Sequence, residues 1–198
     1  MPMMPRSARM TRGFTIVETM VTSTIFLSVG LMAVMWLNGA SDLWWTTNTQ
    51  AHVRETAHLA VNRMVFELRM GTRVGAGSPP NVAIPAAPNN TSITFYLPAD
   101  LDPFDGNTTI VDALGDIEWD AANPVQYTYV PAQRQLLRVA GAQQTVIASD
   151  VTAARFDDAA TDPTLGLNEV KVTITVQRLS PQQRTLSATS TEIVKFRN

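Results

Sequence analysis

The alternation of apolar and polar residues divides the chain into three regions, and the first is a mainly apolar run. It extends from Phe14 to Leu37, and its only ionisable side chain is Glu18. A helix rises about 1.5 Å per residue, so a run of this length can cross the roughly 30 Å hydrocarbon core of a bilayer. The pattern therefore predicts a membrane-spanning helix over residues 14–37.

The second region, residues 38–70, has the pattern of an amphipathic helix. From about residue 47 its apolar residues recur at spacings of three and four, as on one helix face. These residues are Val53, Ala57, Ala60, Val61, Met64 and Leu68. Gly71 follows as a C-terminal stop. Asn38 and Gly39 are compatible either with a break between two helices or with one continuous helix.

The third region, residues 71–198, has the pattern of a β-rich globular domain. It begins with a loop that contains Pro79, Pro80, Pro85 and Pro88, because prolines this dense lack the donors that a central strand needs. Strand-like runs follow at residues 92–97, 125–130, 135–139, 145–148, 152–156, 169–178 and 186–196.

Two details of these runs predict antiparallel pairing and a buried sheet face. A four-residue connection joins runs 125–130 and 135–139, which is typical of a hairpin. Within 169–178, apolar residues at 170, 172, 174 and 176 alternate with polar ones, so one face is buried and the other wet. The predicted fold class is α+β, a long N-terminal helix packed on a mostly antiparallel β-sheet domain.

The distribution of charge predicts how the chain is oriented. Arg6, Arg9 and Arg12 precede the apolar run without any acid, and clustered positive charge holds that end in the cytoplasm. The remainder carries 12 basic and 17 acidic residues, a net charge of −5. We expect no nucleic-acid binding from such a domain, because it lacks a basic stripe to contact phosphates. The chain contains no cysteine, so no disulfide supports it.

The start of the apolar run carries a specific motif, Gly13-Phe14-Thr15-Ile16-Val17-Glu18. It resembles the cleavage and methylation motif of type IV prepilins and type II secretion pseudopilins. In that family a basic leader ends in Gly, the next residue becomes a methylated N-terminus, and a Glu stands at the fifth mature position. The resemblance implies that residues 1–13 are a cleaved leader, that Phe14 is N-methylated, and that Glu18 forms an assembly salt bridge.

The downstream chain resembles more narrowly the PilW- and PulJ-like minor pilins and pseudopilins. Those proteins combine a helix rich in Arg and Glu, a hairpin with a leucine–arginine strand, and a final strand ending in Arg-Asn. The matching segments are Glu67-Leu68-Arg69, Leu136-Leu137-Arg138 and Phe196-Arg197-Asn198. The resemblance implies a low-abundance subunit that helps initiate or cap assembly of a type IV pilus.

The same resemblance implies partners and a location. The partners are the prepilin peptidase, other minor and major pilins or pseudopilins, the inner-membrane assembly platform, and membrane lipid before assembly. The chain would cross the inner membrane once, with its C-terminal domain extracytoplasmic, and then enter a pilus or pseudopilus. Two alternatives stay open: a J-type pseudopilin of a type II secretion system, and a membrane-anchored binding module that does not polymerise.

Few residues elsewhere suggest chemistry. His52 and His58 are six apart, which places them on different helix faces, so we interpret them as solvent-facing side chains and not as metal ligands. The acidic stretch 100–107 resembles a calcium loop but has Phe104 where an oxygen ligand is needed, which favours a solvated loop. No nucleophile elbow or phosphate loop is present, so we expect neither an enzyme nor a cofactor.

Overall fold

The computed structural model describes residues 15–71, 82–101, 110 and 117–196. The chain divides into two compact units, Met1–Trp44 and Trp45–Asn198, each of which is described by itself. Most of the predicted loop before residue 82, the acidic stretch beyond residue 101, and the final Arg197 and Asn198 lie outside the described residues.

One helix, α1 (Ile16–Met70), runs without interruption from the apolar region into the amphipathic one. Asn38 and Gly39 therefore do not break it, and the continuous alternative is correct. Gly39 makes the helix less stable by about 1 kcal/mol relative to Ala, and the many other hydrogen bonds of so long a helix outweigh this cost. Gly71 ends the helix as expected, with its N–H bonded to the Leu68 carbonyl at 3.1 Å.

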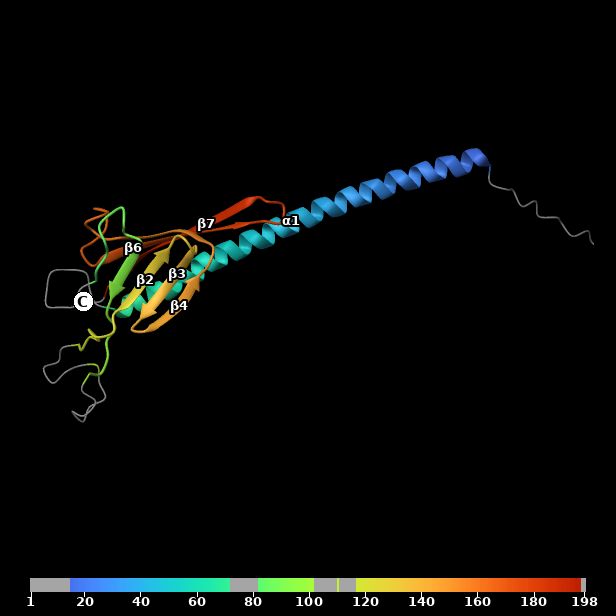
Figure 1. Cartoon of the computed structure of the whole chain (residues 1–198). Helices are drawn as coiled ribbons and strands as arrows, with labels where there is room; N and C mark the ends of the chain where they lie inside the picture. Colours follow the sequence, from blue (N-terminus) through green and yellow to red (C-terminus); the bar gives the residue numbers. More distant parts are fainter. Residues whose placement is uncertain (1–14, 72–81, 102–109, 111–116, 197–198) are drawn as a thin grey trace, which may run out of the picture. The chain divides into compact units, whose positions relative to one another are not determined.

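Seven strands form two separate antiparallel sheets in the globular unit (Figure 1). The first sheet has the order β1-β2-β3-β4 and the second the order β5-β6-β7. Their bounds are β1 (Ser92–Phe95), β2 (Val125–Val130), β3 (Gln135–Ala140), β4 (Gln143–Ala148), β5 (Val151–Asp157), β6 (Glu169–Leu179) and β7 (Thr185–Lys195). All seven predicted strands and the hairpin between β2 and β3 are confirmed. The α+β fold class is confirmed too, and the structure adds that the strands divide into two sheets.

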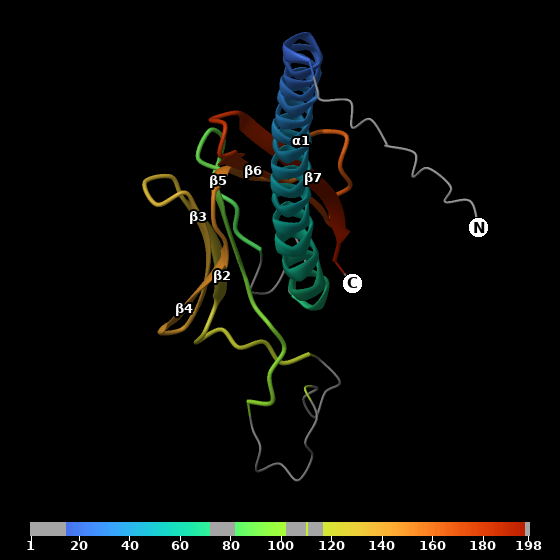
Figure 2. The same ribbon diagram turned by 90° about the vertical axis from the view of Figure 1, so that its right-hand side faces the viewer.

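The hydrophobic core lies where the C-terminal half of α1 packs on both sheets (Figure 2). All six apolar residues of the predicted amphipathic face are buried, and Thr49 and Val65 are buried with them. They join a cluster with Ile93, Phe95 and Tyr127 of the first sheet. Burying such side chains contributes about 1.5–3 kcal/mol each. The stripe therefore attaches this half of the helix to the sheets.

The second sheet has one buried and one wet face, as the alternation in the sequence predicts. Val170, Val172, Ile174 and Val176 of β6 are each no more than 2% exposed. On the other face, cross-strand pairs of hydroxyls lie between β6 and β7, with Thr175 Oγ1 2.9 Å from Thr189 Oγ1. Such pairs add to the stability of the sheet.

Polar contacts hold the two sheets together through β5. The Tyr129 hydroxyl of β2 donates to the Thr152 carbonyl at 2.9 Å. Ahead of β1, the Asn90 side chain donates to the carboxylate of the buried Asp157 at 2.7 Å and to the Phe156 carbonyl at 3.1 Å. Because buried polar groups without partners are costly, these bonds fix the position of β5 relative to β1 and β2.

Candidate functional site

The carboxylate of Glu18 lies in the first turn of α1. The helix begins after Thr15, whose hydroxyl accepts a hydrogen bond from the Glu18 backbone N–H at 3.3 Å. This is half of a capping box, in which a Glu three residues after a Thr cap also bonds back to the cap. No such return bond exists, and among the described residues the Glu18 carboxylate has neither a hydrogen bond nor an ion pair. Capping therefore accounts for Thr15 but leaves the carboxylate available to another group.

The hydroxyl groups in the apolar part of α1 are satisfied within the helix. Thr22 donates to the Glu18 carbonyl at 2.6 Å, Thr24 to the Met20 carbonyl at 2.8 Å, and Ser28 to the Thr24 carbonyl at 2.8 Å. Such bonds let hydroxyl side chains enter an apolar environment at little cost. Glu18 is thus the one ionisable group of this segment among the described residues, and its burial in an apolar environment would need neutralisation or a partner.

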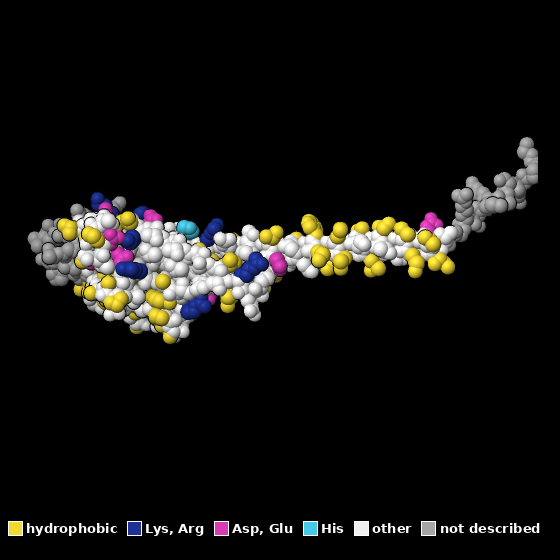
Figure 3. Space-filling view, turned by 90° about the horizontal axis from the view of Figure 1, so that it is seen from above, with side chains coloured by type: hydrophobic (Ala, Val, Ile, Leu, Met, Phe, Trp, Pro, Cys, Tyr) yellow, Lys and Arg dark blue, Asp and Glu magenta, His cyan; other side chains and the backbone are white. Residues whose placement is uncertain are grey.

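Large apolar side chains are exposed at many positions along the N-terminal part of α1, enough to cover every side of the helix. Figure 3 shows those on one face. The most apolar stretch of α1 has no buried residue, and the helix is long and apolar enough to cross a membrane. A helix that is apolar all round is stable only inside lipid or among other apolar helices. A membrane anchor and a bundle of such helices would both provide an apolar environment. A signal sequence has the same apolar character.

A second exposed apolar feature lies on the part of α1 that belongs to the globular unit. Leu59, Phe66 and Met70 are 61%, 67% and 44% exposed. Their spacings of seven and four residues place them on one helix face, away from the face that packs on the sheets. We call these three residues the outer stripe. Exposed large side chains in a row on one face are typical of a contact surface.

A mostly buried ion pair joins α1 to the first sheet. Arg138 Nε of β3 donates to Glu67 Oε2 of α1 at 2.8 Å, and the two side chains are only 20% and 16% exposed. Burial lowers the pKa of Arg138, but the bond and charge of Glu67 outweigh it, so the net shift is upward. Tyr127 of β2 is the cross-strand partner of Arg138, and its buried hydroxyl makes no hydrogen bond of normal geometry. Burial raises the pKa of Tyr127, and the Glu67 carboxylate raises it further.

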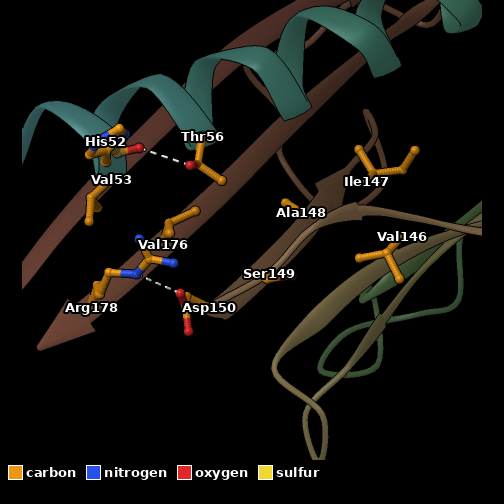
Figure 4. Close-up of a pocket in the computed structure, with 10 residues that line it drawn as sticks. All are labelled: His52, Val53, Thr56, Val146, Ile147, Ala148, Ser149, Asp150, Val176 and Arg178. Atoms are coloured by element: carbon orange, nitrogen blue, oxygen red, sulfur yellow. Dashed lines mark hydrogen bonds and ion pairs between the residues drawn. The ribbon is translucent and has the colours of Figure 1, made fainter. Parts of the chain in front are cut away.

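A pocket of about 290 Å³ opens between α1, the end of β4 with its turn to β5, and β6 (Figure 4). His52 and Thr56 line it from the helix, and apolar side chains such as Val176 form part of its wall. Asp150 and Arg178 are bonded to each other at 2.9 Å. The carboxylate of Asp150 and the guanidinium of Arg178 thus neutralise each other, and we assign the pocket no ligand.

The remaining sequence-predicted residues lie apart from one another. His52 is exposed and lies 3.9 Å from Glu55, while His58 is exposed but also has its Nδ1 3.1 Å from the hydroxyl of Ser190. Among the described residues no three acidic, His or Cys side chains form a group that could hold a metal. Gly13 and Phe14 lie outside the described residues, as does nearly all of the acidic stretch 100–107.

Two site features were missed by sequence reasoning, although one left a signal. The spacing of Thr15 and Glu18 is that of a capping box and could have been read from the sequence. The contact between Glu67 and Arg138 joins residues 71 apart, and no local pattern could have paired them.

Comparison with known proteins adds no relative: no family model, no curated protein and no solved structure matches the chain. The pilin-like architecture is therefore an observation on the structure itself, a long N-terminal apolar helix that packs on antiparallel sheets.

Proposed function

We propose that this chain is a minor pilin, a low-abundance subunit that helps initiate or cap assembly of a type IV pilus. Residues 1–13 would be removed by the prepilin peptidase, Phe14 would be N-methylated, and the apolar half of α1 would wait in the inner membrane before insertion into a filament. The observation that carries the proposal is the Glu18 carboxylate, which has no partner among the described residues of a helix that is otherwise apolar all round.

The energetics of Glu18 support an assembly role. A lone ion in a low-dielectric environment costs several kcal/mol, so a carboxylate at membrane depth needs either neutralisation or a cation. Cleavage before Phe14 would create that cation, because the new amine of a neighbouring subunit lies at nearly the same depth. Such a pair would set the axial register of an incoming subunit within a bundle of apolar helices.

The outer stripe supports the same proposal from the globular unit. Leu59, Phe66 and Met70 expose apolar surface that a single soluble chain gains nothing by exposing. Packing of helices side by side in a filament would bury this surface. The proposal therefore accounts for both exposed apolar surfaces of α1 by one kind of partner, the helices of other pilin subunits.

The test is replacement of the carboxylate by its neutral isostere. Glu18→Gln protein is expected to be cleaved and membrane-inserted normally but to be absent from sheared filaments and not to co-purify with other pilins. Glu18→Asp is the matched control, because it keeps the charge and should retain part of the incorporation. Quantitative mass spectrometry of sheared filaments against membranes measures both.

Other outcomes would point to the alternatives. Normal incorporation of Glu18→Gln would remove the assembly role of the carboxylate and favour a membrane-anchored binding module. A J-type pseudopilin shares Glu18 and the apolar helix, so deletion of the chain distinguishes it: loss of protein secretion, with filaments intact, would assign the chain to a type II secretion system. Abundance equal to that of the main filament subunit would contradict the minor role.

A further inference from the structure

The strand β7 forms an edge of the second sheet and is unusually open. It is eleven residues long and pairs with β6 along its whole length without a register shift. Its only charged residues, Glu192 and Lys195, lie among the last four residues, and it contains no proline. Natural edge strands are usually short, bulged, charged or covered, because an open edge offers backbone groups to other strands.

The direction of the free backbone groups follows from one hydrogen bond. Gln177 N–H of β6 donates to the Asp150 carbonyl at 2.9 Å, so the backbone groups of Gln177 point away from β7. Gln177 lies opposite Ser187, and in an antiparallel ladder both members of such a pair point away from each other. The N–H and C=O of Ser187 therefore point out of the sheet.

Alternation extends this result along the strand. Thr189, Thr191 and Ile193 have the same orientation as Ser187, because the register continues without a bulge. The inward bond from Phe196 N–H to the Asn168 carbonyl, at 3.0 Å, fits the same alternation. Among the described residues, no group forms a hydrogen bond with these outward backbone N–H and C=O groups.

The other three sheet edges are protected. At β1, Thr94 exchanges two backbone hydrogen bonds with Ala83, at 2.8 and 2.9 Å. At β5, Phe156 N–H donates to the Asn90 carbonyl at 2.9 Å. The remaining edge, β4, is six residues long, and a register shift between Leu136 and Leu137 interrupts its pairing with β3. Within the described chain, β7 is thus the edge that keeps none of these protections.

We infer that β7 is a docking site for an extended segment of a different polypeptide, which adds to the second sheet as a further strand. Hydrogen bonds between the backbone of the bound segment and the outward groups from Ser187 to Ile193 would supply the affinity. Contacts between its side chains and those of Thr189, Thr191 and Ile193 would supply the specificity. Since these three are β-branched, a segment rich in Val, Ile and Thr fits best.

A second copy of this chain does not fit the site. Head-to-tail pairing needs a second open edge, and the described edges at β1, β4 and β5 are protected as above. Two-fold pairing of β7 with itself would be antiparallel. Because β7 and the half of α1 inside the globular unit run in the same general direction, the two copies of this half of α1 would then be antiparallel, which does not suit two chains anchored in the same membrane (Figures 1 and 2). This last step rests on the membrane insertion in the proposed function.

Photocrosslinking of the full-length chain in its own cells tests the inference. The photoreactive residue p-benzoylphenylalanine replaces Ile193, and in a control it replaces Thr173, which lies on the same sheet face but in the interior strand β6. We expect position 193 to give a product with a different polypeptide and position 173 to give none. Products from both positions would indicate docking on the face and would overturn the edge site.

A proline and alanine pair then separates the backbone from the side chain. Thr191→Pro removes one outward N–H and leaves the bonds to β6 in place, whereas Thr191→Ala keeps that N–H. We expect the product to fall at least tenfold in Thr191→Pro and to stay within twofold in Thr191→Ala. Ser187→Pro removes another outward N–H and replaces Thr191→Pro if that variant does not melt cooperatively.

Three further results would overturn the inference: equal products in the proline and alanine variants, a product made only of this chain, or no intermolecular product. Different measurements would contradict the proposed function. Leader removal and the behaviour of Glu18→Gln report on the N-terminal helix, whereas Thr191→Pro protein should be cleaved normally whatever its crosslinking.

Discussion

Arg138 and Glu67, which lie 71 residues apart, bond at 2.8 Å and join β3 to α1 across the core. Both belong to the segments on which the narrower pilin resemblance rests, Leu136-Leu137-Arg138 and Glu67-Leu68-Arg69. The pair is mostly buried, so each charge depends on the other. It gives the otherwise apolar contact between helix and sheet a defined position, which apolar packing alone would specify less sharply.

Removal of both partners should cost less than the sum of the two single removals. Arg138→Met leaves the Glu67 carboxylate buried without a cation, and we expect a loss of about 3 kcal/mol in the free energy of unfolding. Glu67→Gln combined with Arg138→Met should cost less than the sum of the two single changes. Denaturant unfolding of the detergent-solubilised chain, followed by circular dichroism, measures the three values. An additive result would mean that the two residues do not depend on each other.

Substitution of Tyr127, the cross-strand partner of Arg138, tests a further polar group next to that pair. Its hydroxyl is buried and makes no hydrogen bond of normal geometry, although it lies close enough to Glu67 and Arg138 for their charges to affect its pKa. Tyr127→Phe removes an unsatisfied polar atom and should leave stability unchanged or raise it slightly. A loss above about 1.5 kcal/mol would show that the hydroxyl does bond to Glu67 in solution.

Gly71 is required by a close approach. A Cβ atom added there would lie 2.6 Å from Cδ2 of Phe95, whose ring is fully buried. Gly71→Ala should therefore destabilise the globular unit by about 1–3 kcal/mol. Gly39→Ala is the control, since nothing lies within 4 Å of its added Cβ and alanine favours the helix. Thermal unfolding of both variants in the same detergent compares them, and equal stability would contradict the close approach.

The motif at Gly13 predicts that the N-terminus is processed, as the proposed function requires. Intact-mass analysis of membrane-extracted protein is expected to find a chain that begins at N-methylated Phe14. Gly13→Leu should block cleavage, because a side chain there would occupy space in which the peptidase needs a bare backbone. Gly39→Ala serves again as a control that leaves the leader unchanged. An unprocessed wild-type chain would contradict the prepilin assignment.

The sequence determined the elements of this protein because their causes are local. The apolar run, the spacing of Val53, Ala57 and Met64, and the alternation from Val170 to Val176 are periodic, and periodicity decides between helix and strand. Thus the helix, all seven strands and one hairpin could be predicted, as could the position of Glu18 in the first turn.

Only the tertiary structure decided how these elements combine. The division of the strands into two sheets depends on contacts such as Tyr129 with Thr152, and the pairing of Glu67 with Arg138 depends on helix and sheet meeting. The open edge at β7 could not be predicted either, since an edge is defined by what does not pair with it. Every strand offers the same backbone donors and acceptors, so the side chains of one strand do not specify which strand pairs with it. The order of strands therefore cannot be predicted from a local sequence pattern.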